Sequence, residues 1–323
     1  MLPTINIGPL RISSFALMVF LGVLFYLGFS LFVLIKIEKK SKRVIKEALT
    51  VSALSFAALF VGALLFNSLF HTIENGYPTF GGITWEGGVL VGFCAFILLS
   101  HFIVKRERGR EIELFSSVMP GIVMAHAFGR VGCFLGGCCF GRITEGPLGV
   151  VFPDGSPAAE LYPNTQTGVG SFTVLPTQLF EAGFELVLFI VMITLYKRIK
   201  NDNLAIYLVF YSIFRFVLEF WRGDNRGATG LSLSPSQLMS ILLFALGILI
   251  FLFSHGIIFG GLKKKCEDWR AEADSGIYDY PKTLSAEQAA AFAELEVLFR
   301  LKNEGAITDE EYDNKKKELL EKI

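Results

Sequence analysis

Seven apolar runs separated by polar connections cover the chain up to about residue 260. Most of them reach the roughly 17 to 25 residues that a helix needs to cross the hydrocarbon core of a bilayer. The runs are Ile12–Ile37, Ala48–Phe70, Gly88–Val104, Leu114–Phe128, Pro176–Tyr196, Leu204–Phe220 and Leu238–Phe259, of which the third and fourth are short. This pattern predicts an all-α, polytopic membrane protein with seven transmembrane helices.

The connections between the runs alternate in their content of Lys and Arg. Basic residues are concentrated in the segments 36–46, 105–110, 197–200 and 263–265. The basic residues of the opposite connections are Arg11, Arg130, Arg142, Arg222 and Arg226. Because cytoplasmic loops carry an excess of Lys and Arg, we predict an N-terminus outside and a cytoplasmic C-terminus. The few outer arginines are then candidates for a function.

The composition agrees with a membrane protein and narrows the possible partners. Hydrophobic residues make up 52% of the chain, and 30 basic residues balance 30 acidic ones. A net charge of zero gives no basis for nucleic-acid binding, so we expect no nucleic-acid partner. The first apolar run has the length of a membrane span and no small-residue cleavage site, so we expect a permanent anchor and not a signal peptide.

The chain becomes polar and acidic beyond Cys266. We expect a membrane domain over residues 1–262, a linker over 263–285 and a cytoplasmic helical hairpin over 286–323. A pair of short helices has too little apolar surface for an independent core, so the hairpin is expected to dock or self-associate. It contains no catalytic motif.

Two helices are predicted within this tail, at Ala286–Asn303 and Thr308–Lys322. Gly305 is placed to end the first helix, and Thr308 with Glu311 forms a capping box for the second. The sequence resembles the short C-terminal helical hairpin that is appended to many bacterial membrane proteins.

The segment His126–Arg142 contains five glycines within thirteen positions. So many glycines predict an irregular backbone, which at membrane depth is buried in protein or lines a cavity. Free N–H groups there bind anions, and Arg130 and Arg142 add bidentate recognition of phosphate. We interpret the segment as a lipid headgroup site. The alternative is a re-entrant turn that packs helices closely, with arginines that reach the interface.

The sixth apolar run carries a second group of polar residues. Tyr211, Arg215, Glu219 and Arg222 are spaced by four, four and three positions, which places them on one helical face. Charges within a span face a bundle interior or a hydrated pocket, so this face is a candidate site. The alternative is an Arg215/Glu219 pair that holds helices together.

Two span starts share a motif in which proline is followed by Gln178 in one case and by Gln237 in the other. Proline suits the first turn of a helix. Both starts face the predicted outer side, so Gln178, Glu181 and Gln237 are expected to meet one cavity. Two ordinary helix starts are the alternative.

Glu86 lies between glycines just before the third apolar run. In a partly desolvated pocket its pKa would rise, which would make it a usable proton acceptor. A simple partner for the helix dipole is the alternative.

Three of the five cysteines are Cys133, Cys138 and Cys139, close to His126. The C-x4-C-C spacing lacks the C-x2-C pairs of a structural zinc site, so we expect no metal. Packing beside glycine is favoured, a disulfide on the oxidising face comes next, and a nucleophile activated by His126 stays open.

Several of these motifs, in this order, resemble those of bacterial prolipoprotein diacylglyceryl transferases. The motifs are Ile7–Leu10, Gly129–Gly132, Pro176–Glu181, Arg215–Arg222 and Ser236–Ser240. The resemblance implies transfer of a diacylglyceryl group from phosphatidylglycerol to the lipobox cysteine thiol of a prolipoprotein, with release of glycerol phosphate. It implies a multi-pass protein of the bacterial inner membrane, with phosphatidylglycerol and prolipoprotein as partners and no cofactor.

The resemblance also implies a set of site residues. The expected catalytic residues are Arg130 at the phosphate, Arg215 with Tyr211 at the headgroup and leaving group, and Glu86 as base. The expected substrate-binding residues are Arg130, Gly132, Cys133, Gly141, Gln178, Glu181, Glu219, Arg222 and Gln237.

The chain departs from the family pattern at five positions. Glu86 replaces a histidine, Cys133 an asparagine, Cys138 a glutamate and Phe15 a tyrosine, while Leu64 lies near the position of an arginine. These changes keep two alternatives open. One is a transferase of the same fold that uses another lipid or acceptor, and the other is a non-enzymatic channel or lipid-binding membrane protein.

Overall fold

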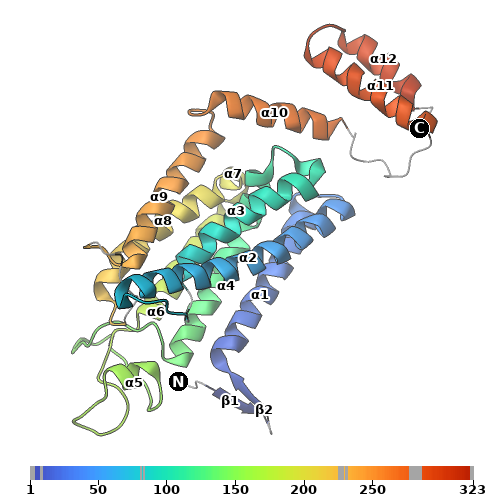
Figure 1. Ribbon diagram of the computed structural model, residues 1–323. Helices are drawn as coiled ribbons and strands as arrows, with labels where there is room; N and C mark the ends of the chain where they lie inside the picture. Colours follow the sequence, from blue (N-terminus) through green and yellow to red (C-terminus); the bar gives the residue numbers. More distant parts are fainter. Residues whose placement is uncertain are drawn as a thin grey trace.

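The computed structural model describes residues 4–7, 10–80, 82, 84–224, 229, 232–275 and 286–320. Within these residues, seven helices are long and apolar enough to cross a membrane (Figure 1). They are α1 (Ser14–Phe32, extended by a π-helical turn, Val33–Ile37), α2 (Lys42–Asn75), α3 (Trp85–Ile103), α4 (Glu111–Gly136), α6 (Thr177–Thr194), α8 (Asn203–Leu218) and α9 (Pro235–Ser254). The predicted seven-span helical fold is confirmed.

Shorter elements lie at the two ends of the bundle (Figure 1). An antiparallel hairpin of β1 (Thr4–Ile7) and β2 (Leu10–Ser13) precedes α1. The other short elements are α5 (Pro157–Leu161), α7 (Tyr196–Ile199), α10 (Gly260–Asp274), α11 (Ala286–Asn303) and α12 (Asp309–Leu320). The hairpin and α5 lie at one end of the bundle, and α7 and α10 lie at the other.

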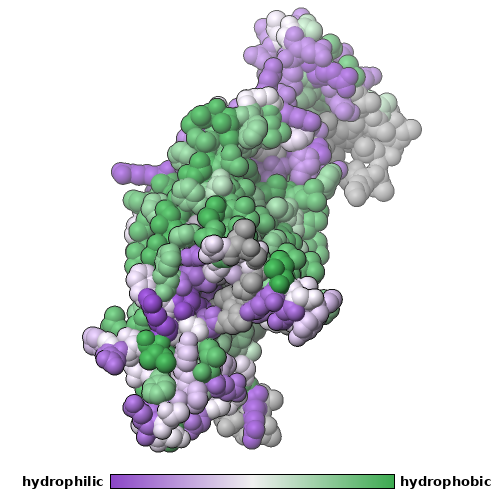
Figure 2. All heavy atoms as spheres, turned by 60° about the vertical axis from the view of Figure 1, so that its left-hand side comes forward, coloured by the Kyte–Doolittle hydropathy of each residue, from purple (hydrophilic) through white to green (hydrophobic). Residues whose placement is uncertain are grey.

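On the face shown in Figure 2, hydrophobic residues cover much of the middle of the molecule, and hydrophilic residues gather toward its ends. Large apolar side chains point outward on several helices; Leu98 of α3 and Val187 of α6 are each 60% exposed. An apolar belt of this extent is stable only in contact with lipid. The chain is therefore a multi-pass membrane protein.

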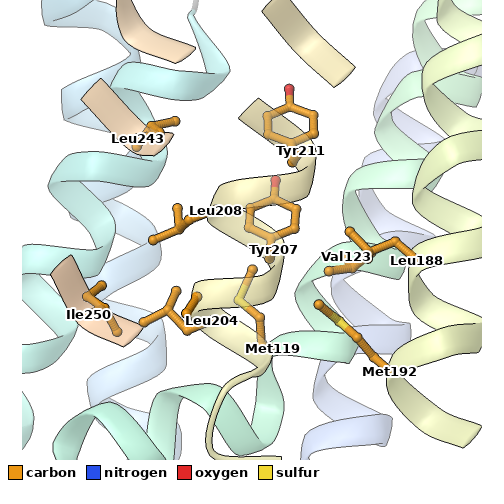
Figure 3. Close-up of a cluster of buried hydrophobic side chains, with 11 residues drawn as sticks. Met119, Val123, Leu188, Met192, Leu204, Tyr207, Leu208, Tyr211, Leu243 and Ile250 are labelled. Atoms are coloured by element: carbon orange, nitrogen blue, oxygen red, sulfur yellow. The ribbon is translucent and has the colours of Figure 1, made fainter. Parts of the chain in front are cut away.

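Helix α4 is the centre of the bundle and packs against α1, α3, α6 and α8, while α2 pairs with α3 and α8 with α9. The main core lies where α4, α6, α8 and α9 meet (Figure 3). Tyr207 and Tyr211 of α8 stack there with ring centroids 5.1 Å apart. Their hydroxyls point in the same direction, away from Leu204 (Figure 3). The tyrosines thus separate an apolar core from a polar region above it.

The glycine-rich segment is more regular than the sequence predicted. Helix α4 continues through Gly129 and Gly132 to Gly136, and the backbone turns only at Gly137, which has a φ of 73°. Close packing explains the difference, because a Cβ on Gly132 would stand 3.0 Å from Met18 of α1. Tertiary contact with α1 thus overrides the low helix propensity of glycine.

The basic connections meet at one end of the bundle, together with acidic partners. Lys40 contacts Glu107 at 2.7 Å, and Lys200 contacts Glu38 at 2.9 Å. The β-hairpin and the long α4–α6 connection lie at the other end (Figure 1). Because basic connections alternate with the others along the chain, they must all lie on one side of a bundle of spans, and the structure has this grouping. The direction of the bundle in the membrane stays a prediction.

The predicted linker 263–285 begins as a helix, because α10 covers its first part. Arg110 Nη2 lies 2.7 Å from Asp274 Oδ2, and Arg270 Nη2 lies 2.5 Å from Glu113 Oε1. These pairs attach α10 to the start of α4. Residues 276–285 of the linker lie outside the described residues, and the domain boundaries stay a prediction.

The helical hairpin of the tail is present as α11 and α12. Gly305 has a φ of 69° after α11. The capping box is also formed, since Thr308 N donates to Glu311 Oε2 at 2.8 Å and Glu311 N donates to Thr308 Oγ1 at 3.3 Å. Leu295 and Leu319 are buried between the two helices.

Replacing Gly62 with alanine should destabilise the contact between α2 and α3. A Cβ at this position would stand 2.5 Å from Val91 Cβ, so the helices must separate, at a cost of about 1–3 kcal/mol. Thermal unfolding of the protein in detergent measures the effect. Gly183→Ala is the matched control, because nothing lies within 4 Å of a Cβ there and alanine is the better helix former. Equal melting temperatures for the two variants would contradict the proposed close packing.

Candidate functional site

Arg215 of α8 binds three side chains from three elements. Its Nε donates to Glu86 Oε1 at 2.9 Å, its Nη1 donates to Glu219 Oε2 at 2.7 Å, and its Nη2 donates to Ser236 Oγ at 2.6 Å. The Arg215 side chain is 1% exposed. Arg215 therefore forms the predicted pair with Glu219 and also holds α8 to Glu86 on α3. The structure thus agrees with both a polar site and a pair that holds helices together.

Glu181 of α6 links the second buried arginine, Arg130, to Tyr211, which lies one helical turn before Arg215 on α8. Its Oε1 accepts a hydrogen bond from the Tyr211 hydroxyl at 2.8 Å and lies 3.1 Å from Arg130 Nη2. Glu181 is completely buried. The structure therefore brings Arg130, Arg215, Tyr211 and Glu181 together in one polar cluster, although they come from α4, α6 and α8.

His126 and Glu185 belong to the same cluster and are absent from the predicted site residues. His126 Nε2 accepts from Arg130 Nε at 3.1 Å, and His126 Nδ1 lies 2.8 Å from Glu185 Oε1. The imidazole stacks on Trp85, with ring centroids 4.1 Å apart. A signal exists in the sequence, because His126 precedes Arg130 by four positions and Glu185 follows Glu181 by four, so each pair shares a helical face.

This cluster holds an unusual amount of charge inside a membrane bundle. Two buried arginines pair with the carboxylates of Glu86, Glu181 and Glu219, and Glu185 lies beside His126. Buried charges of this kind are costly unless they are paired, and they mark functional sites in membrane proteins. The arrangement suits an anionic ligand that exchanges with one of the carboxylates at the guanidinium groups.

Arg222 does not continue the helical face of Arg215, as its spacing had predicted. The α-helix ends at Leu218 and is followed by a 3-10 turn over Glu219–Trp221, which changes the direction of the next side chain. Arg222 instead binds Asp224 through Nε at 2.9 Å and Nη2 at 2.7 Å. Burial raises the pKa of Asp224 to about 6, although Arg222 opposes the shift. Arg226 lies outside the described residues.

The two glutamines at the span starts have different roles in the structure. Gln178 Nε2 donates to the backbone oxygen of Cys138 at 2.7 Å, so it holds the turn after α4. Gln237 forms a capping box with Ser234, and its Oε1 accepts from Ser234 N at 3.1 Å. For Gln237 the structure supports the alternative, an ordinary helix start.

Gly132 and Gly141 act as close contacts between elements. A Cβ on Gly141 would stand 2.7 Å from both Leu175 Cβ and Trp221 O, where the turn after α4 crosses the segments before α6 and after α8. Gly141 also forms a β-bridge with Arg222. These glycines thus bring the surrounding chain close to the cluster.

Three thiols lie near Arg130 and Arg222. Cys133, Cys138 and Cys139 are free, and their sulfur atoms lie within 4.8 Å of one another. The pKa of the Cys139 thiol lies well below its ordinary value, first because of hydrogen bonds with Cys133 and Cys138 and then because of the charges of Arg222 and Arg130. The disulfide considered from the sequence is not formed.

Comparisons with known proteins give the family of this chain. The model of the family described as prolipoprotein diacylglyceryl transferase matches residues 3–253. The chain belongs to the prolipoprotein diacylglyceryl transferase family. A second family model, described as a short C-terminal domain, matches residues 293–320, which include most of α11 and all of α12.

Curated relatives in this family differ in how much of the chain they cover. Phosphatidylglycerol–prolipoprotein diacylglyceryl transferase 2 of Clostridium perfringens is 34% identical over 186 residues, or 57% of this chain and 64% of the relative. The similarly named protein of Rickettsia bellii is 30% identical over 75% of this chain and 91% of its own length. The one of Francisella tularensis subsp. novicida is 28% identical over 82% and 96%. The chain thus spans less than two thirds of the Clostridium perfringens relative.

The structure describes only part of the opening motif and part of the segment ahead of Glu86. Gly8 and Pro9 of the opening motif lie outside the described residues, as do Gly81 and Ile83 ahead of Glu86. In this member of the prolipoprotein diacylglyceryl transferase family, Phe15 packs at 3.2 Å from the Cβ position of Gly132.

Proposed function

We propose that this protein transfers the diacylglyceryl group of phosphatidylglycerol to the lipobox cysteine thiol of prolipoproteins and releases glycerol phosphate. The observation that carries the proposal is the buried cluster in which Glu181 binds both Arg130 and Tyr211, one helical turn before Arg215. Family membership supports the same reaction. The reaction needs cations where negative charge collects on the leaving phosphate, and preorganised donors in a dry site are most effective there.

The two arginines receive separate tasks in this proposal. Arg130 binds the phosphate of the lipid, while Arg215 and Tyr211 contact the headgroup and stabilise the leaving glycerol phosphate. Glu181 and Glu219 hold the guanidinium groups in position until the phosphate binds. Glu219 is the partner best placed to be displaced, because its side chain is 8% exposed whereas that of Glu181 is completely buried.

The site is proposed to open toward the outer leaflet of the bacterial inner membrane. The support is the positive-inside pattern, whose basic connections all meet at the opposite end of the bundle. Prolipoproteins carry their lipobox across the membrane, so an acceptor thiol arrives from the same side. Phosphatidylglycerol and the prolipoprotein are therefore the proposed partners.

Complementation tests this function directly. The chain is expressed in bacterial cells depleted of their own transferase, and lipoproteins are analysed by mass spectrometry for the diacylglyceryl modification. Restored modification is expected for the unchanged chain and for Arg11→Ala, which removes an exposed outer arginine. Failure despite normal amounts in the membrane would favour a transferase of the same fold with another lipid or acceptor.

Glu86→Gln should lower the transfer rate by about 100-fold or more, because glutamine neither balances Arg215 nor accepts a proton. The pH dependence separates the two roles. If Glu86 takes the acceptor proton, the loss should shrink as the pH passes about 8.5, where the thiol ionises by itself. A constant loss at every pH would leave Glu86 as the group that positions Arg215. Glu160→Gln on the exposed α5 is the control.

A further inference from the structure

The thiols of Cys133 and Cys138 are brought together by the way α4 ends. Cys138 N donates to Cys133 O at 3.1 Å, and Gly137 N donates to Phe134 O at 3.2 Å. With Gly137 in the left-handed region, this is a Schellman motif, in which the residues three before and two after the helix end contact each other. The C-x4-C-C spacing is therefore compact in space.

The third thiol, that of Cys139, is held beside Cys133 and Cys138 by a strained backbone conformation. Cys139 has a φ of 63°, a left-handed conformation that costs a non-glycine residue free energy and persists only where its surroundings impose it. The start of α6 supplies this constraint. Thr177 Oγ1 donates to Cys139 O at 2.9 Å, and Gln178 Nε2 donates to Cys138 O at 2.7 Å.

Two cations lie near the three thiols, and two of the thiols are open to solvent. Arg130 and Arg222 are the cations whose charges act on Cys139. Cys133 is buried, whereas Cys138 and Cys139 are partly exposed, so an ion can reach the sulfur atoms. Three thiolates and one Zn²⁺ would carry a net charge of −1, and Arg130 and Arg222 place positive charge near it.

We propose that Cys133, Cys138 and Cys139 bind one Zn²⁺ ion and leave its fourth position for the acceptor thiol. Three protein ligands with an open position are the pattern of a catalytic zinc site, whereas structural sites are closed by four. The spacing argument made from the sequence excludes only the structural type. Three sulfurs within 4.8 Å are close to the separation that Zn–S bonds of about 2.3 Å require.

The role of the ion in the reaction rests on the proposed transferase function. A thiol that coordinates Zn²⁺ loses its proton, here to solvent, and the metal stays in the same oxidation state. The acceptor sulfur then forms a C–S bond with the glycerol carbon of the diacylglyceryl group. The C–O bond to phosphate breaks, and glycerol phosphate leaves with the electron pair. The site would thus supply an acceptor thiolate without a side-chain base, and Glu86 would then act by positioning Arg215.

Metal content of the full-length protein tests the site independently of activity. The protein is purified in detergent under reducing, anaerobic conditions, incubated with Zn²⁺, desalted and analysed by elemental mass spectrometry. About one zinc per chain is expected. Cys133→Ser, Cys138→Ser and Cys139→Ser should each lose most of it, while Cys94→Ser on the exposed side of α3 should retain it. Zinc that persists in the three serine variants, or is absent from the unchanged chain, overturns the proposal.

Cobalt provides a second readout that reports on the ligands themselves. Co²⁺ bound by three thiolates gives sulfur-to-metal charge-transfer absorption, which should disappear in each of the three serine variants. A disulfide between any two of these cysteines in protein isolated without reductant would also overturn the proposal.

Activity separates the failure of this proposal from failure of the transferase function. Removal of zinc with a chelator should abolish diacylglyceryl transfer, and added Zn²⁺ should restore it. Full transfer after removal would refute the metal role and leave the transferase function intact. If neither form transfers while zinc binds stoichiometrically to the three cysteines, the site stands and the transferase function fails.

Discussion

Glutamine in place of Arg215 should lower kcat/KM for diacylglyceryl transfer by about 100- to 1,000-fold, the usual effect of removing one preorganised donor from developing negative charge. The free energy of unfolding of the variant should also fall. Glu86 and Glu219 would lose their partner inside the bundle, and breaking a buried ion pair costs about 3–5 kcal/mol. Release of glycerol phosphate in detergent measures the first effect, and thermal unfolding measures the second.

A double variant separates these two effects of Arg215. Arg215→Gln combined with Glu86→Gln removes one orphaned charge, so it should regain part of the lost stability without regaining activity. Recovery of transfer in the double variant would contradict a direct role of the guanidinium in the reaction. Arg215→Lys retains the charge but not the three-way hydrogen bonding, so it should stay well below the unchanged protein.

Arg130→Gln should reduce transfer by about 100-fold or more, with much of the loss in KM for the lipid if Arg130 contacts the phosphate before reaction. The substitution also leaves Glu181 with only the Tyr211 hydroxyl as a close donor. Initial rates at several phosphatidylglycerol concentrations separate KM from kcat. Arg11→Ala is the control for general effects of outer charge. Unchanged rates in Arg130→Gln would remove Arg130 from the site.

The seven spans could be predicted from the sequence because hydropathy acts over whole helices. The boundaries are less accurate where polar ends extend a helix, as in α2, which runs from Lys42 after the N-cap Ser41 to Asn75. The sequence places the end of the regular helix in α4 too early, because the low helix propensity of glycine does not include the contact of Gly132 with α1. Local preference yields to packing when a neighbouring helix needs close approach.

The main charged residues of the cluster could also be predicted, since a charge inside an apolar run is conspicuous. The hydrogen bonds and ion pairs between these residues could not be predicted. Which carboxylate meets which arginine depends on how α3, α6 and α8 pack, and the sequence alone contains no signal for the pairing of Asp224 with Arg222. The thiol group was missed as a unit for a related reason, because only the left-handed turn at Gly137 reveals that Cys133 and Cys138 are neighbours.

The attachment of α10 to the start of α4 has a mechanical consequence. Helix α4 has 26 residues and extends about 39 Å at 1.5 Å per residue, from the ion pairs with Asp274 and Arg270 to the thiols at its far end. A partner that pulls on α10 would therefore load the start of α4 as well as α9, which precedes α10 in the chain. Strain from that side of the bilayer is delivered along the same helix that carries His126, Arg130 and Cys133.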